Sequence, residues 1–213
     1  VTEEERELAL IEALQALELG RVEDSQSRYG DALRYFEKAL ELYRAHGDSA
    51  GEADVVQALG SVYQNQSQFT AAIEHYTRGL EIARNIGYET QESKLLGSLG
   101  SVYLEQGQFE RAIEYLSRAI EMDRRSGSQG VLGTQIGNLA NLYVYTGQNE
   151  RAVECYLESL EILRAFGDRR GEGRQLGNLA TTYVQLNDYE RAILCFGQAI
   201  EIHRAVGNRR SEG

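Results

Sequence analysis

Apolar residues recur along the chain at helical spacing. Within residues 109–126 the apolar positions are Phe109, Ala112, Ile113, Leu116, Ala119, Ile120 and Met122. On an α-helix these positions form one broad stripe, whereas a half-buried strand would need strict alternation. Residues 131–143, which come next along the chain, also carry apolar residues at helical spacing. The pattern therefore predicts helices, with an apolar face on each.

The pattern itself repeats every 40 residues. Equivalent positions hold Tyr63, Tyr103, Tyr143 and Tyr183; Leu19, Leu59, Leu99, Leu139 and Leu179; and Ala32, Ala72, Ala112, Ala152 and Ala192. A unit this short cannot bury a core alone, so neighbouring units must stack and share one. The sequence therefore predicts an all-α solenoid of about five helix–turn–helix repeats, or ten helices.

Breaks between helices follow the same period. Within a unit, Gly107, Gly147 and Asn187 stand where a left-handed residue would end the first helix. The second helix is expected to end at the glycines three residues after a repeated arginine, which are Gly47, Gly87, Gly127, Gly167 and Gly207. Asp48 and Asp168 can cap the following helices, and Thr2 with Glu5 resembles a capping box.

The repeated positions resemble the tetratricopeptide repeat. Its pattern is matched in the second unit by Leu59, Gly60, Tyr63, Ala72, Tyr76 and Gly79, and in the fifth by Leu179, Ala180, Tyr183, Ala192, Phe196 and Ala199. The usual unit has 34 residues; the longer one here, with GNLA at 137–140 and 177–180, is similar to the Pins/LGN adaptors and bacterial relatives. The resemblance implies a right-handed α-solenoid.

We expect one superhelical domain over residues 1–213. Its repeats would span about 8–47, 48–87, 88–127, 128–167 and 168–207, and 208–213 would begin a further, truncated repeat. The segment GNRRSEG at 207–213 indeed resembles GDRRGEG at 167–173.

Composition narrows the functional classes. The chain has 22 Lys and Arg against 33 Asp and Glu, a net charge of -11, which argues against binding nucleic acid or an anionic membrane. No apolar run is long enough to span a bilayer, so we expect a cytoplasmic protein. Cys155 and Cys195 occupy equivalent places in successive repeats, and we predict free thiols there.

In the family, the first helix of each pair lines a concave groove. The resemblance therefore implies a peptide-binding surface made by Lys94, Ser98, Ser101, Thr134, Asn138, Asn141, Tyr145, Arg174, Asn178, Thr181 and Gln185. An asparagine amide can both donate to and accept from a peptide backbone, although the alternative is a solvated polar face. Gly97, Gly137 and Gly177, inside helices, indicate that either a neighbouring helix or a ligand backbone approaches closely.

No catalytic or metal-binding set emerges. The three histidines occupy different places in their repeats, and no phosphate-binding or nucleophile motif occurs. The periodic glutamates Glu41, Glu81, Glu121, Glu161 and Glu201 precede the repeated arginines by three residues and are interpreted as partners in helix-surface ion pairs. We therefore predict no enzyme activity, no cofactor and no metal.

The predicted function is an interaction scaffold that holds a protein or peptide, with acidic residues to meet Lys94 and Arg174, in its groove. Two alternatives remain open: a structural solenoid that self-assembles, and a regulatory or sensor module of a larger protein. Self-association would use the C-terminal helix, whose apolar stripe includes Ile193, Phe196 and Ile202.

Overall fold

The computed structural model describes residues 2–127 and 129–211, with side chains for 2–127 and 132–207. These residues form ten α-helices and no strand. The helices are α1 (Glu3–Ser25), α2 (Tyr29–Ala45), α3 (Ser49–Asn65), α4 (Phe69–Ile86), α5 (Glu89–Glu105), α6 (Phe109–Ser126), α7 (Gln129–Tyr145), α8 (Asn149–Ala165), α9 (Arg169–Gln185) and α10 (Tyr189–Ser211).

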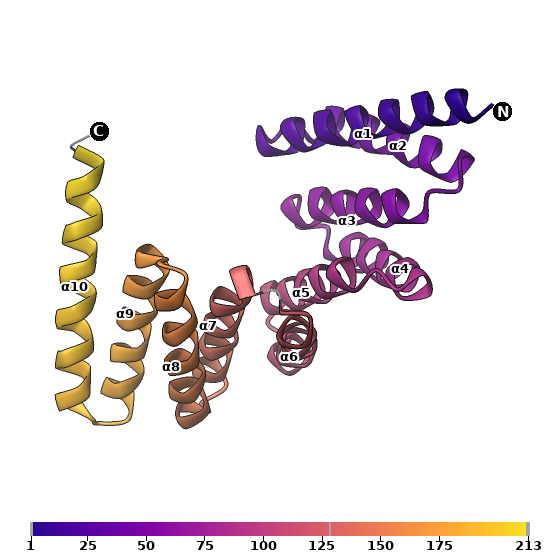
Figure 1. The fold of residues 1–213 in the computed structure, drawn as a ribbon. Helices are drawn as coiled ribbons and strands as arrows, with labels where there is room; N and C mark the ends of the chain where they lie inside the picture. Colours follow the sequence, from indigo (N-terminus) through magenta and orange to yellow (C-terminus); the bar gives the residue numbers. More distant parts are fainter. Residues whose placement is uncertain (1, 128, 212–213) are drawn as a thin grey trace. The chain divides into compact units, whose positions relative to one another are not determined.

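The helices group into two compact units, Val1–Gly107 with α1–α5 and Gln108–Gly213 with α6–α10. Within each unit, helices that follow one another along the chain pack side by side (Figure 1). In the first unit, α1 packs against α2, α2 against α3, α3 against α4, and α4 against α5. The prediction of a single domain over 1–213 stays a prediction.

Helix ends follow the predicted residues with one exception. Thr2 and Glu5 form the capping box, and the side chains of Asp48 and Asp168 accept hydrogen bonds from Gly51 and Gly171. Left-handed backbone conformations occur at Gly107, Gly147 and Asn187 as predicted, and at Ser27 and Ser67 in the first two repeats.

The exception is Gly207. The second helix ends at a left-handed glycine at Gly47, Gly87, Gly127 and Gly167, but α10 continues through Gly207 to Ser211. The break predicted at Gly207 is therefore wrong. A glycine inside a helix costs only about 1 kcal/mol, so the helix can continue through Gly207. At the other four glycines, the helix that follows packs against the helix that ends there, and this packing favours the left-handed turn. The last residues of the predicted further repeat, 212–213, lie outside the described residues.

Large side chains of the second helices cover small residues of the first helices. Phe36 of α2 lies over Gly20 of α1, and the ring of Tyr76 of α4 lies over Gly60 of α3. Both rings are buried, as are the repeated alanines Ala32, Ala72, Ala112, Ala152 and Ala192. The small residues allow the helices to approach, and the rings then fill the space between them.

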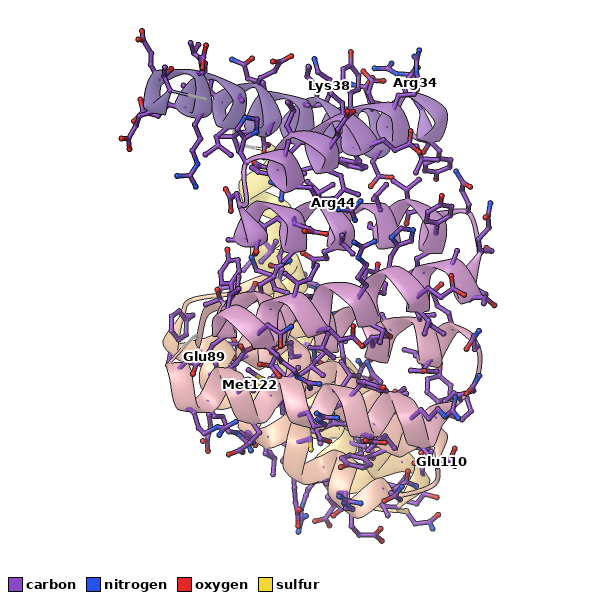
Figure 2. All side chains as sticks on the ribbon, turned by 90° about the vertical axis from the view of Figure 1, so that its right-hand side faces the viewer. Arg34, Lys38, Arg44, Glu89, Glu110 and Met122 are labelled. Atoms are coloured by element: carbon purple, nitrogen blue, oxygen red, sulfur yellow. The ribbon has the colours of Figure 1, made fainter. Side chains whose placement is uncertain are left out.

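The repeated arginines tie each pair of helices to the next pair. Arg44 of α2, labelled in Figure 2, forms an ion pair with Glu52 of α3 at 2.8 Å. The same step of eight residues joins Arg84 to Glu92 and Arg164 to Glu172, both at 2.7 Å. Arg124 has Leu132 at that step and pairs instead with Glu158 of α8.

The predicted pairing of these arginines with glutamates three residues earlier is therefore wrong, although Glu121 does form an ion pair within its own helix, with Arg125 at 3.9 Å. The arginine stands in the last turn of its helix, where the chain reverses, so the first turn of the next helix lies within its reach. Glu172, which is almost fully buried, is held in place by packing and meets Arg169 as well as Arg164. An acceptor fixed in this way costs less side-chain entropy than a mobile surface glutamate.

None of the described helices combines the length and apolar character that a bilayer span requires.

The packing at Gly60 generates a stability prediction. Gly60→Ala should destabilise the protein by about 1–3 kcal/mol, because the added methyl group would lie 2.5 Å from Cε1 of the buried Tyr76 ring. The control is Gly177→Ala in α9, which should stabilise by up to about 1 kcal/mol because its methyl group would meet no atom within 4 Å. Urea denaturation of both variants measures the difference; equal effects would contradict the packing described.

Candidate functional site

The predicted site residues of the second unit lie on α7 and α9. Thr134, Asn138, Asn141 and Tyr145 follow one another along α7 at steps of four, three and four, and Arg174, Asn178, Thr181 and Gln185 do so along α9. Such steps place side chains on one face of a helix. All eight are at least partly exposed, and α7 packs beside α9. We call these eight residues the α7–α9 face.

Two asparagines of this face are joined to each other. The side-chain nitrogen of Asn178 donates to Oδ1 of Asn141 at 3.1 Å, and the same oxygen accepts from the hydroxyl of Tyr156 on α8. Burial raises the pKa of Tyr156 to about 12, and Thr182 also contacts its hydroxyl. The tyrosine therefore stays a neutral donor that fixes Asn141, and Asn141 in turn orients Asn178.

The glycines of these helices differ in their surroundings. A Cβ on Gly137 would clash with the amide of Gln175, a fully buried side chain of α9. Close helix packing therefore explains Gly137. Cβ atoms on Gly97 and Gly177 would meet nothing within 4 Å, so neighbouring side chains do not require glycine there. At these two positions the approach of a ligand backbone remains the predicted reason.

Tyr145 lies at the end of α7 and is largely exposed. Its ring stacks on Phe109 at the start of α6, with centroids 5.8 Å apart and planes inclined by 3°. With the residue 70% exposed, the ring adds an apolar element to the α7–α9 face. Asn138, Arg174, Thr181 and Gln185 are also exposed.

Lys94, Ser98 and Ser101 belong to the first unit, where they lie on α5. The positive charge of Lys94 acts on the carboxylate of Asp54 on α3 and favours its ionised form. Burial raises the pKa of Asp54, and the positive charges of Lys94 and Arg21 act in the opposite direction. Lys94 is therefore compensated by a neighbouring carboxylate. Ser98 and Ser101 are half-buried.

Sequence reasoning missed several polar contacts between first helices. Gln64 of α3 accepts a hydrogen bond from the Tyr76 hydroxyl at 2.9 Å and donates to Glu105 of α5 at 2.5 Å. Gln91 donates to Gln57 at 2.8 Å. Burial raises the pKa of the Tyr76 hydroxyl above its usual range. The sequence feature that could have indicated these contacts was the repeated tyrosine, because a buried tyrosine hydroxyl needs a hydrogen-bond partner from a nearby polar residue.

No group of three or more metal-ligating side chains occurs within the described part of the chain. Cys155 and Cys195 are free thiols, as predicted, and burial raises the pKa of both. A thiol with a raised pKa is a poor nucleophile. The α7–α9 face therefore offers hydrogen bonds, one aromatic ring and a cation to a binding partner.

Similar solved structures share this fold. BtubC (BKLC) from P. vanneervenii has a TM-score of 0.71 and 20% identity, over 97% of this chain and 93% of its own length. RapI has a TM-score of 0.80 and 17% identity over 91% of this chain, which spans 54% of RapI. YrrB has a TM-score of 0.62 and 21% identity, over 89% of this chain and 86% of its own length. These likenesses confirm the all-α solenoid.

No curated protein sequence matches the chain. The family model described as tetratricopeptide repeat does match it, over residues 12–85, 51–125 and 131–205. These segments cover most of the 213 residues, and the chain therefore belongs to the tetratricopeptide repeat family.

Proposed function

We propose that the chain is a non-enzymatic scaffold for protein interactions, and that the α7–α9 face binds an extended peptide segment of a partner. The observation that carries the proposal is the character of this face. In a chain with a net charge of -11, the face has no carboxylate and one cation, Arg174. Arg174 forms no ion pair with any side chain that the structure describes.

The amides of the α7–α9 face suit a peptide backbone. Asn138 is exposed, and Asn178, which donates to Asn141, keeps its own side-chain oxygen as an acceptor. Because Tyr156 fixes Asn141, the pair loses little freedom when a ligand binds, which favours affinity. The open surface at Gly177 lets a ligand backbone approach α9 closely.

Charge indicates which peptides the face prefers. Arg174 is an uncompensated cation whose guanidinium can bind a carboxylate through two parallel hydrogen bonds. Lys94 is less suited to this role because its charge already interacts with the carboxylate of Asp54. We therefore propose a peptide with an acidic residue placed to meet Arg174, and a flat apolar residue placed to meet Tyr145. The proposal requires no cofactor, nucleic acid or membrane.

The comparisons support a protein partner. YrrB, a structure with the same fold, is described as a tetratricopeptide-repeat protein with an unusual peptide-binding site. We propose a surface of the same kind here, formed by the polar side chains exposed on α7 and α9. A likeness at 21% identity carries no residue roles, so the residues of the proposal rest on the α7–α9 face alone.

The binding prediction concerns two exposed side chains. A variant with Asn138→Ala and Arg174→Ala should bind selected peptides at least about tenfold more weakly, because it loses an amide contact and a charge-assisted hydrogen bond. The peptides are selected from a displayed library of unstructured segments, and affinity is measured by fluorescence anisotropy. Exposed substitutions of this kind should change stability by less than about 0.5 kcal/mol.

The matched control is Arg125→Ala, which removes an exposed arginine from α6 in the same unit. It should leave affinity unchanged. Asn178→Ala adds a second test, since loss of its bond to Asn141 should weaken binding further. Peptides that bind the double variant as tightly as the parent protein would show that the α7–α9 face is not the binding surface.

The electrostatics of Asp54 predict a pH dependence. Since burial raises its pKa in the folded state, the folded protein binds more protons than the unfolded chain just above the ordinary aspartate pKa. Stability is therefore lost as pH rises through that window. Asp54→Asn should be more stable than the parent at neutral pH, and the difference should shrink as pH falls to about 4.

Urea denaturation of Asp54→Asn and the parent at the two pH values tests this. Glu37→Gln, at an exposed position on α2, controls for the general loss of a negative charge. A variant that is less stable than the parent at neutral pH would mean that Lys94 and Arg21 outweigh the cost of burying Asp54.

A further inference from the structure

A second arginine lies one helical turn from Arg174 on α9. Arg170 is four residues earlier in the helix, so the two side chains lie on the same side of α9. A further step of four leads to Asn178, which belongs to the α7–α9 face. Both arginines are exposed, and neither forms an ion pair with a side chain that the structure describes. The sequence-based prediction of the site did not include Arg170, which extends the α7–α9 face toward the start of α9.

The carboxylates of α9 and its N-cap are engaged by other groups. Glu172 is almost fully buried and forms ion pairs with Arg164 at 2.7 Å and with Arg169 at 2.5 Å. Asp168 accepts a hydrogen bond from the backbone of Gly171 and so caps the helix. These two carboxylates therefore leave the charge of the two exposed arginines available to a ligand.

The helix that packs beside α9 adds no charge of its own. α7 and α9 lie side by side within their unit (Figure 1), and the sequence of α7 contains no Asp, Glu, Lys or Arg. On the α7–α9 face, α7 contributes the hydroxyl of Thr134 and the amide of Asn138, and both can donate hydrogen bonds. Because α9 has three arginines and one glutamate, the two helices together are positive in a chain whose net charge is -11.

The spacing of the two arginines indicates which anion they suit. Side chains four residues apart on a helix have Cβ atoms about 5–6 Å from each other, so both guanidinium groups can reach one group of a ligand. A carboxylate has two oxygens, and a single arginine occupies both when it binds through two parallel hydrogen bonds. A phosphate monoester has three free oxygens and a charge of about -1.5 to -2 at pH 7, so it can bind two guanidinium groups at once.

We propose that Arg170 and Arg174 together bind a phosphorylated side chain, so that the partner of the α7–α9 face is a phosphopeptide. This inference rests on the proposed function, because it names the partner of the same face. Thr134 and Asn138 stand at the positions of α7 that are equivalent to Arg174 and Asn178 on α9, and they supply further donors. A phosphate group accepts hydrogen bonds from all of these groups and brings the negative charge that the arginines need.

A segment with two carboxylates is the alternative ligand for the two arginines. It would carry a similar total charge, but it would have to hold two side chains in place instead of one. Each side chain that is fixed on binding loses rotamer freedom, which costs affinity. One phosphorylated side chain therefore suits the pair better, and the two ligands can be compared directly.

Three fluorescein-labelled peptide pools test the inference. The pools have the same randomised flanks, and their centres are Ala-phosphoserine-Ala, Ala-Ser-Ala and Asp-Ala-Asp. The phosphoserine pool should bind the parent protein at least about tenfold more tightly than the serine pool, because it adds charge-assisted hydrogen bonds to two arginines. It should also bind more tightly than the Asp-Ala-Asp pool. Fluorescence anisotropy measures all three affinities.

Single substitutions show whether the two arginines cause the preference. Arg170→Ala should lower the affinity for the phosphoserine pool at least about fivefold more than the affinity for the serine pool. Arg174→Ala should weaken the binding of both the phosphoserine and the Asp-Ala-Asp pools. The matched control is Arg169→Ala, which removes the neighbouring exposed arginine that pairs with Glu172 and should keep the preference. Circular dichroism confirms that each variant is folded.

Three results would overturn the inference: equal affinity of the parent protein for the phosphoserine and serine pools, a preference that survives Arg170→Ala, or tighter binding of the Asp-Ala-Asp pool. The proposed function is tested separately, by the unmodified peptides selected from the library. If the variant with Asn138→Ala and Arg174→Ala loses those peptides while phosphoserine gives the parent no advantage, the face binds peptides and the phosphate inference alone is wrong. A parent protein that binds no peptide of either kind would refute both.

Discussion

The structure depends on one constraint: no repeat can bury its apolar residues without a neighbour. The second helices α2 and α4 therefore carry a large side chain that covers a small residue of their own first helix, as Phe36 covers Gly20 and Tyr76 covers Gly60. The same side chain is then closed off by the first helix of the following repeat, which leaves Tyr76 and Tyr156 almost fully buried. Burial of apolar area drives this stacking. Because the sequence repeats every 40 residues, similar side chains meet at each contact between successive repeats.

Ion pairs between successive repeats differ from one contact to the next. Arg44, Arg84 and Arg164 reach across to carboxylates of the next helix. Where Leu132 replaces the glutamate, Arg124 forms its ion pair with Glu158 of α8 instead. Exposed ion pairs of this kind add little stability singly. Their consistent register nevertheless favours one arrangement of helix on helix, because a shift along the contact would separate all the charges from their partners.

Most of the fold could be predicted from the sequence, since the period and the caps at Asp48 and Asp168 are local signals. The break at Gly207 could not be: a glycine permits a left-handed turn, but packing of the next helix decides whether the turn forms. The partners of the repeated arginines were also misassigned, because sequence spacing indicates partners on the same helix and not those on the next helix. At the candidate site, positions on α7 and α9 were predictable, whereas the bond between Asn141 and Asn178 depends on how closely two helices approach.

The same constraint separates two kinds of exposed surface. Where a first helix faces away from its partners, the period permits polar residues to vary, and the α7–α9 face carries amides, a tyrosine and a single arginine. Where a repeat meets its neighbour, the period keeps apolar residues even on α1 and α10, at positions such as Leu19 and Ile200. A surface that varies between repeats can recognise a particular partner. A surface that retains the repeat's own packing residues is shaped by the stacking of repeats and leaves no room for such variation.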